Sequence, residues 1–275
     1  ITQKNIEILK NIGIYFVNPE CGLLACGDVG NGKLASQDDI LEMMDYAMSP
    51  KPLLGKNICV SAGPTQESID PVRYITNHSS GKMGYAIARK AFCLGANVTL
   101  VSGPTYLKKP YGVKVIDILN ANDMYEEVFN IYDKQDYMIM SAAISDYSCQ
   151  NIATEKIKKK AEKITLELQK NKDVLYTLGL NKKTHQILCG FAMETQNLLE
   201  NATEKLLKKN CDMIVANHLK TPGAGFQGDT NIATLITQDS IEECGLLSKD
   251  ELALKILNTL YAMEEKNHVI SDWYR

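Results

Sequence analysis

The sequence contains no run of about 18 apolar residues, which a membrane-spanning helix requires, so no membrane partner is expected. It contains no Cys-x-x-Cys pair, and its 4 histidines are scattered, so a zinc site is not indicated and no metal ligand can be named. The first loop that follows a strongly apolar segment, residues 63–84, also lacks the Gly-x-Gly-x-x-Gly turn of common dinucleotide-binding proteins. The net charge is only −3, with no basic excess. Nucleic acid is therefore not expected as a partner, and an anionic ligand would need a local cluster of positive groups.

The cysteines indicate a reducing compartment. Several of the 8 lie inside apolar segments, where cysteine packs as a small hydrophobe, and we therefore expect a cytoplasmic protein. The first residues, Ile1 to Lys4, include neither an initiator Met nor the apolar segment of a signal peptide. We read this start as a cut inside a longer protein.

Two blocks of different character are joined by a short linker over residues 49–55. The first block, residues 1–48, predicts a helix over 2–11, a short strand over 14–17, a glycine-rich loop over 21–32 and a helix over 36–47. It has too little apolar surface to form a core alone, so we interpret it as the end of a preceding domain. Residues 56–275 would then form the main domain.

The main block alternates strands with helices. Strands are predicted over 57–62, 97–102, 113–118, 136–143, 186–191 and 212–216, and helices over 83–94, 121–132, 173–178, 197–208 and 249–264. A late strand over 231–237 is a candidate for antiparallel pairing. Near-continuous apolar strands indicate that helices cover both faces, so the fold class is α/β with a doubly wound, Rossmann-like, mostly parallel sheet. Ligands of such sheets bind outside the carboxyl ends of the strands, which selects the loops after Ala62, Ala143, Phe191 and Asn217.

The first of these loops, residues 63–84, is too long and specialised for a simple connector. It begins at Gly63 and places Ser79 and Ser80 just before a predicted helix. The free N–H groups at the start of a helix favour a phosphate, so we interpret the loop as an anion cradle. An ordered surface loop with capping serines is the plainer alternative.

Three further segments are candidates for chemistry. Asp146 follows the strand over 136–143, where a carboxylate can bind a ribose hydroxyl or a metal, although a turn cap is equally compatible. The lysine run over 156–160 precedes a strand-like segment over 164–168 and suggests a flap that carries ammonium groups over an anion, although such runs are usually solvated. Residues 27–33 match a phosphate-binding P-loop, but Leu34 stands where Ser or Thr would ligate Mg²⁺.

Five segments resemble, in order and spacing, the phosphopantothenate–cysteine ligase family. They are DPVRYITNHSSGKMG at 70–84, AAISDY at 142–147, EKIKK at 155–159, GFAMET at 190–195 and DMIVAN at 212–217. LACGDVGNGK at 24–33 resembles the tail of flavin-dependent phosphopantothenoylcysteine decarboxylases, with Cys26 in the place of their proton-donating cysteine. The chain is thus similar to the C-terminal part of the bifunctional bacterial coenzyme A biosynthesis proteins. FMN would belong only to the missing part of the decarboxylase.

The resemblance implies a reaction in two steps. CTP, with Mg²⁺, activates the carboxylate of 4′-phosphopantothenate to an acyl-cytidylate and releases pyrophosphate, and the amine of L-cysteine then displaces CMP. Asn77 and Lys156 match catalytic residues, and Arg73 lies in the segment that meets substrate and the dimer partner. The implied nucleotide-binding residues are Gly63, Ser79, Ser80, Ala142, Ala143, Asp146, Lys156, Lys172, Asp173, Val174, Leu175, Phe191, Lys205 and Lys209. CTP rather than ATP follows from the resemblance alone.

The family also implies a homodimer with the active site near the interface, and a larger homo-oligomer for the full-length parent. This chain departs from the common pattern at three positions, with Gln66 for Arg, Lys172 for Pro and Met193 for Ala. Two other functions stay open. A non-catalytic scaffold for the decarboxylase would bind CTP without turnover. A nicotinamide oxidoreductase is disfavoured because the loop over 63–84 lacks that glycine turn and because the sequence contains no Tyr-x-x-x-Lys pair.

Overall fold

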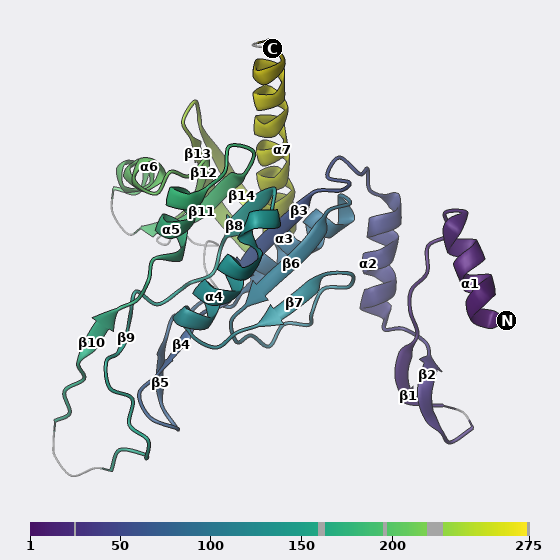
Figure 1. Cartoon of the computed structure of the whole chain (residues 1–275), viewed down its shortest axis with the longest axis horizontal. Coiled ribbons are helices and arrows are strands. Elements are labelled where there is room, and N and C mark those ends of the chain that lie inside the picture. The colour runs from purple at the N-terminus through teal and green to yellow at the C-terminus, as the bar shows by residue number, and fades with distance from the viewer. Residues whose placement is uncertain (25, 159–162, 195–196, 219–227, 274–275) are drawn as a thin grey trace.

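A computed structural model describes residues 1–24, 26–158, 163–194, 197–218 and 228–273 (Figure 1). Its centre is an eight-stranded sheet. Six neighbouring strands pair in parallel, and two further strands, β13 (Thr230–Thr237) and β14 (Ile241–Ser248), extend one edge by antiparallel pairing. The strands, in spatial order, are β14, β13, β12 (Met213–His218), β11 (Ile187–Glu194), β8 (Tyr137–Met140), β3 (Asn57–Ala62), β6 (Asn97–Ser102) and β7 (Lys114–Asp117). The predicted doubly wound, mostly parallel α/β fold is confirmed.

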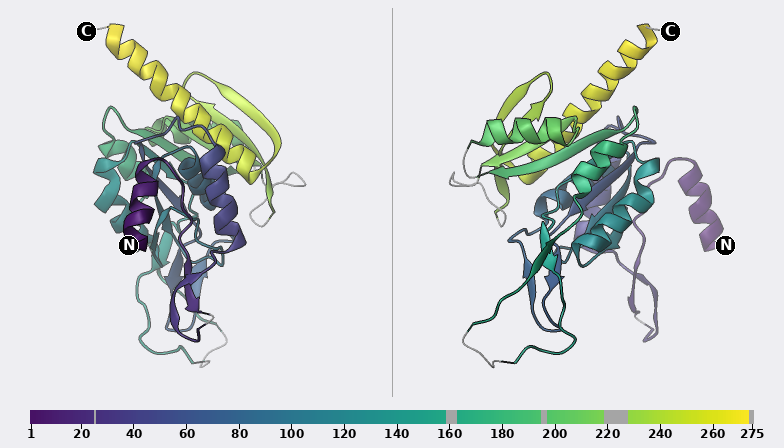
Figure 2. Two further views of the ribbon diagram at one scale, coloured as in Figure 1. Left: turned by 90° about the vertical axis from the view of Figure 1, so that its right-hand side faces the viewer. Right: turned by 60° about the vertical axis from the view of Figure 1, so that its left-hand side comes forward.

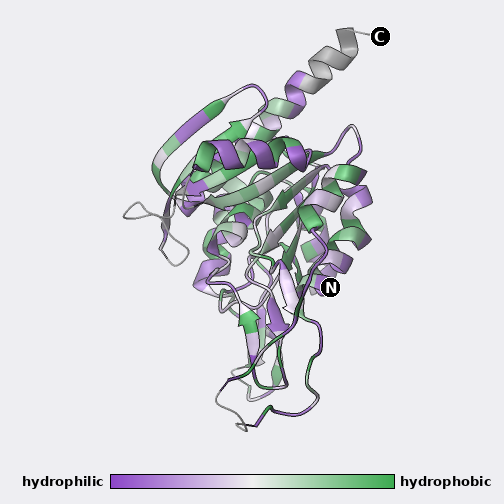
Figure 3. Ribbon diagram, turned by 90° about the vertical axis from the view of Figure 1, so that its left-hand side faces the viewer, coloured by the Kyte–Doolittle hydropathy of each residue, from purple (hydrophilic) through white to green (hydrophobic). Residues whose placement is uncertain are grey.

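Helices cover both faces of this sheet. On one face, α3 (Lys82–Cys93) and α7 (Lys249–Trp273) pack against side chains such as Ile58 and Val60 of β3. The intervening Cys59 points to the other face. That face is covered by α4 (Ala121–Ile131), α5 (Val174–Asn181) and α6 (Leu198–Lys208). Burial on both sides explains why the inner strands are mostly apolar, and much of the sheet is green in Figure 3.

Local signals fix most helix boundaries. The predicted helix over 2–11 coincides with α1 (Thr2–Asn11). The side chain of Ser36 accepts a hydrogen bond from Asp39 N at 3.2 Å and begins α2 (Gln37–Met48), which packs on the outer side of α3. Asn120 and Asp123 form a reciprocal capping box at the start of α4, and a short 3₁₀ turn, η1 (Tyr132–Lys134), follows that helix.

Two predictions for the N-terminal block, apart from its helices, are wrong. The strand predicted over 14–17 does not form, because these residues have no partner strand and Tyr15 is 53% exposed. The loop predicted over 21–32 is instead a hairpin of β1 (Glu20–Leu23) and β2 (Val29–Lys33). A P-loop requires a strand, a loop and a helix in succession, so the hairpin rules it out for residues 27–33.

Two small hairpins project together from one side of the sheet (Figures 1 and 2). One pairs β4 (Gln66–Ser68) with β5 (Tyr74–Thr76), and the other pairs β9 (Tyr147–Cys149) with β10 (Leu168–Lys170). The strand predicted over 164–168 is therefore displaced toward β10. We call residues 66–76, 147–158 and 163–170 the arm.

A buried carboxylate fixes α7 to the sheet. Glu264 is 7% exposed and accepts hydrogen bonds from Tyr137 Oη at 2.7 Å and from Lys56 Nζ at 2.6 Å. Glu264→Ala leaves both donors without this partner, so we expect the free energy of unfolding to fall by about 2–4 kcal/mol in urea denaturation. The exposed Glu265→Ala, its control, should change it by less than about 0.5 kcal/mol. Equal losses from the two variants would contradict this role for Glu264.

Candidate active site

The site lies where the order of the sheet reverses. The chain runs from β3 outward to β6 and then returns to the other side of β3 as β8, which opens a crevice at the carboxyl ends of these two strands. Hydrogen bonds join the loops beyond the strands. Ser141 Oγ donates to Ser61 O at 2.6 Å, Ala143 N donates to Gly63 O at 2.9 Å, and Thr65 N donates to Ala143 O at 3.2 Å. The loops therefore form a fixed floor.

Two adjoining cavities, of about 460 and about 130 Å³, open above this floor. They form one cleft because they share Ala142, Ile144, Asp146, Phe191 and Lys205. The larger cavity reaches residues 77–84, which include the first residues of α3, and the carboxyl-terminal parts of β11 and β12. The smaller one reaches the start of α5 and the end of α6.

Most of the residues predicted to bind nucleotide meet in this cleft. They are Ser79, Ser80, Ala142, Ala143, Asp146, Lys172, Asp173, Val174, Leu175, Phe191, Lys205 and Lys209. Asn77 lines the larger cavity, and its side-chain Nδ2 donates to Ala143 O at 2.9 Å, which orients the amide. The segments predicted from sequence at four separate loops thus converge on one place.

Four predicted residues do not line either cavity. Cys26 lies in the turn between β1 and β2, and Lys156 is exposed on the arm. Arg73 is held on the arm by Asp70 and Ile157 of its own chain. Gly63 lies beneath the start of α3. A Cβ built on Gly81 would lie 3.3 Å from Gly63 Cα, so the two glycines pack closely against each other. Of the lysine run, Lys159 and Lys160 lie outside the described residues, as do Ala25 and Thr195 of the other quoted segments.

The start of α3 is built for close approach. Gly81 is the N-cap residue, with a φ of +78°, and a Cβ there would lie 2.7 Å from Thr105 Cγ2 and 3.3 Å from Gly63 Cα. Only glycine combines this positive φ with this spacing. The first turn of α3 carries no acidic residue, and its N-terminal end lines the larger cavity. A helix start of this kind favours an anion.

The cleft is basic although the chain is slightly acidic. Among the described residues, six lysines and two aspartates line it, whereas the whole chain carries −3. The lysines are Lys82, Lys170, Lys172, Lys205, Lys209 and Lys249. Burial, followed by the nearby charge of Lys82, lowers the pKa of Lys249. The cleft therefore supplies the local positive charge that an anionic ligand of this chain requires.

At the smaller cavity, Asp173 begins α5 by accepting a hydrogen bond from Tyr176 N at 3.0 Å, and it pairs with Lys209 at 2.8 Å. Burial raises the pKa of Asp173, but the hydrogen bond from Lys209 and that from the Tyr176 backbone outweigh it and leave the pKa below its ordinary value. Lys172 Nζ lies 4.5 Å from the centre of the Tyr125 ring. Lys205 Nζ donates to Phe191 O at 2.7 Å.

Sequence reasoning left several residues of the larger cavity without a role, among them Lys82, Asn217, Asn231 and Lys249. Lys82 pairs with Asp229 at 2.7 Å, and Asn231 Nδ2 donates to Asn217 Oδ1 at 3.0 Å. Lys82 and Asn217 lie inside the motifs over 70–84 and 212–217, so these motifs could have indicated that both residues belong to the site. Lys249 opens the last helix, and neither it nor Asn231 belongs to any pattern that would mark it.

The buried cysteines of the described chain are placed for packing. Burial raises the pKa of Cys59 and of Cys211 to about 12, which keeps both thiols protonated and poorly nucleophilic. No group of three or more His, Cys, Asp or Glu side chains gathers within the described ranges in a way that would hold a metal ion. Within the same ranges, no helix is both long and apolar enough to cross a membrane.

The fold and the cleft define an α/β protein with a basic cleft at the switch point of a doubly wound sheet. The chain belongs to the family described as DNA/pantothenate metabolism flavoprotein C-terminal domain, whose model matches residues 53–263.

Relatives and a solved structure agree with this family. The chain is 42% identical over 269 residues to the coenzyme A biosynthesis bifunctional protein CoaBC of Bacillus subtilis (strain 168), in a match that covers 96% of the chain but only 66% of that protein. A crystal structure of the C-terminal domain of CoaBC matches with a TM-score of 0.67 and 43% identity, over 78% of this chain and 99% of that one. A cysteine/cysteine sulfinic acid decarboxylase of an unknown prokaryotic organism is 39% identical, over 95% of this chain and 75% of its own length.

Proposed function

We propose that the chain acts in coenzyme A biosynthesis as a phosphopantothenate–cysteine ligase, joining 4′-phosphopantothenate to L-cysteine with consumption of CTP. In this proposal residues 56–275 are the ligase domain, residues 49–55 a linker, and residues 1–48 the end of a decarboxylase domain. The observation that supports it is the basic cleft, in which Asn77, Asp146 and Lys205 converge on the switch point. The relatives named above as CoaBC support the pathway.

The chemistry requires positive charge. A carboxylate that attacks a phosphate brings two negative charges together, and at about 4 Å they repel by ~4 kcal/mol at an effective dielectric near 20. Lysines along the cleft offset this repulsion and stabilise the pyrophosphate as it leaves. The start of α3 adds backbone N–H groups for phosphate oxygens. Asn77 holds the acyl intermediate by hydrogen bonding, since its amide is already oriented by Ala143 O.

A magnesium ion fits this cleft through one protein ligand. Mg²⁺ is usually held by one or two carboxylates together with substrate phosphates. Asp146 is exposed and lines both cavities, whereas Asp173 is engaged by Lys209 and by the start of α5. Asp146 would therefore hold the ion, which would supply charge neutralisation for the triphosphate.

The proposal is tested by incubating the chain with CTP, Mg²⁺, 4′-phosphopantothenate and cysteine and measuring pyrophosphate. We expect pyrophosphate release that depends on 4′-phosphopantothenate, and a faster rate with CTP than with ATP. Absence of release with every nucleotide would contradict the ligase. Binding of CTP without turnover would instead favour a nucleotide-binding scaffold for the decarboxylase. We do not expect decarboxylation by this chain alone, although one relative is named as a decarboxylase.

Lys205 offers a test within the cleft. It lines both cavities, whereas Lys208, on the same helix, is exposed and lines neither. Lys205→Gln removes a charge that meets the nucleotide, so we expect the KM for CTP to rise about 10-fold, which corresponds to about 1.4 kcal/mol. Lys208→Gln removes the same charge outside the cleft and should leave the KM within about twofold. Equal effects of the two variants would show that only the overall charge matters.

The same proposal includes a homodimer in the cytoplasm with the active site near the interface, and a larger homo-oligomer for the full-length parent. Dilution that dissociates the dimer should then abolish ligation. Fully active monomers would contradict a shared site.

A further inference from the structure

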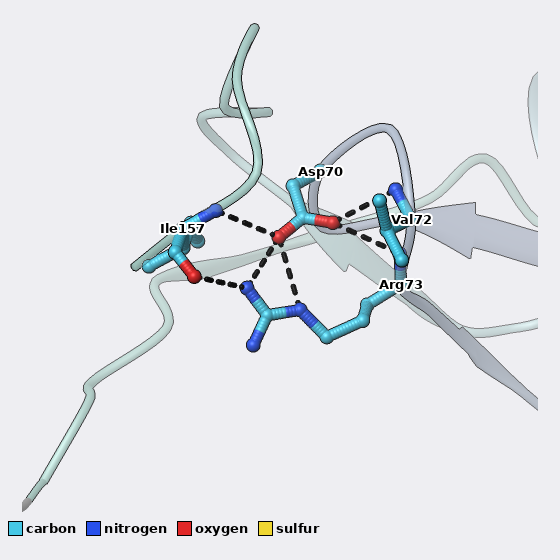
Figure 4. A network of polar contacts seen from close by, with 4 residues as sticks. All are labelled: Asp70, Val72, Arg73 and Ile157. Atoms are coloured by element: carbon cyan, nitrogen blue, oxygen red, sulfur yellow. Dashed lines mark hydrogen bonds and ion pairs between the residues drawn. The ribbon is translucent and has the colours of Figure 1, made fainter. Parts of the chain in front are cut away.

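The arm contains a buried carboxylate with an unusual number of donors (Figure 4). The side chain of Asp70 is fully buried. Its Oδ1 accepts from the backbone N–H groups of Val72 and Arg73, both at 2.9 Å. Its Oδ2 accepts from Arg73 Nε at 3.0 Å, from Arg73 Nη2 and from Ile157 N at 3.1 Å. The hydrogen bond from Arg73 is the main cause that lowers the pKa of Asp70, so the carboxylate stays ionised.

The two oxygens of Asp70 have different tasks. Oδ1 accepts hydrogen bonds only from Val72 and Arg73, two and three residues further along the chain, and these bonds stabilise the turn between β4 and β5. Oδ2 reaches Ile157, which lies 87 residues away in the sequence. Arg73 Nη2 also donates to Ile157 O at 3.1 Å. Both backbone polar groups of Ile157 are therefore held by the Asp70–Arg73 pair, and Ile157 follows Lys156 directly.

We propose that Asp70 is a positioning residue for Lys156. By fixing the main chain of Ile157, it sets where the neighbouring lysine is presented, without itself touching substrate. The inference rests on the proposed function, in which the ammonium of Lys156 offsets charge during carboxylate activation. A displacement of about 1 Å in a catalytic group can cost up to about 100-fold in rate. The hydrogen bonds that join Asp70 and Arg73 to Ile157, which we call the anchor, therefore affect the rate through the position of Lys156.

Asp70→Asn should keep the hydrogen bonds of the turn but remove those of the anchor. The asparagine keeps one oxygen for the turn, but its amide nitrogen cannot accept the hydrogen bonds from Ile157 and Arg73. Hydrogen exchange of the peptide that contains Ile157 should become about 10-fold faster or more in the full chain. Glu167→Gln removes an exposed carboxylate from the same arm and should leave that exchange unchanged. Unchanged exchange in Asp70→Asn would overturn the anchor, whether or not the chain ligates.

Kinetics then test whether the anchor acts through Lys156. Asp70→Asn should lower kcat about 10-fold or more and leave the KM for CTP within about twofold, because Asp70 lies outside the cleft. In a Lys156→Gln background, Asp70→Asn should cost nothing further, since both changes remove the same contribution. Losses that multiply would overturn the proposal. A wild-type chain that shows no ligation would contradict the proposed function, while the exchange result would still decide whether the anchor exists.

Discussion

Lys156→Gln should lower the rate of ligation about 100-fold or more, with little change in stability. The substitution removes one positive charge from the group that we propose to meet developing charge on the phosphate, and loss of a single such donor typically costs about 100- to 1,000-fold. Lys156 is exposed on the arm, so folding should be unaffected. The measurement is pyrophosphate release and product formation at saturating substrates. Lys163→Gln removes the same charge elsewhere on the arm and should retain full activity.

The position of Lys156 also predicts which subunit it serves. It lies on the arm, outside the cleft of its own chain, so we expect it to act in the cleft of the partner in the proposed homodimer. Mixing Lys156→Gln with Asn77→Asp chains should then restore about a quarter of wild-type ligation, because half of the dimers are mixed and each holds one intact site. If the lysine serves its own chain, the mixture stays inactive. A fully active Lys156→Gln would remove the catalytic assignment altogether.

The sheet and its helices could be predicted because burial on both faces leaves a strong apolar pattern. The strands over 57–62 and 97–102 coincide with β3 and β6, whose inner residues are almost entirely buried. The hairpins β4–β5 and β9–β10 left no such pattern. Their strands are three residues long, and four of the six residues in β4 and β5 are polar. Whether these strands form therefore depends on hydrogen bonding to the partner strand and not on a pattern within each strand. β14 was missed because most of its residues are exposed and two are glutamates.

Sequence reasoning brought Asn77, Asp146 and Phe191 to one cleft because each belongs to a motif at or after the end of a predicted strand. The sequence could not show that Gly63 lies beneath the start of α3 and outside both cavities, because a glycine beside a phosphate and a glycine beneath a helix look alike in sequence. Their difference is the approach of Gly81, which only the packed structure shows. Lys249 was missed because it begins a helix far from every motif, and its place in the cleft depends on how α7 packs against α3. Such contacts between distant elements leave no local signal.

Gly84→Val should destabilise the fold by about 3 kcal/mol or more and abolish ligation. Gly84 lies in the first turn of α3, and a Cβ there would lie 2.5 Å from Ala62 Cβ, 2.7 Å from Ser141 Oγ and 2.9 Å from Ser61 O. These contacts belong to the carboxyl end of β3 and to the loop after β8, which together form the floor of the cleft. Any side chain at Gly84 would push the start of α3 away from that floor.

Gly84→Ala has two opposing effects on stability, and its measurement shows which is larger. Helix propensity alone predicts that alanine stabilises α3 by up to about 1 kcal/mol. Overpacking predicts a loss of about 1–3 kcal/mol, and it should prevail because β3 is rigid and two of the three contacted atoms belong to its residues. Gly30→Ala is the matched control, since its Cβ would meet only Leu24 Cδ1, at 3.5 Å. Thermal unfolding of both variants measures the difference. A more stable Gly84→Ala would show that α3 can move off β3 at no cost, and the fixed position of the start of α3 above the floor of the cleft would then have to be abandoned.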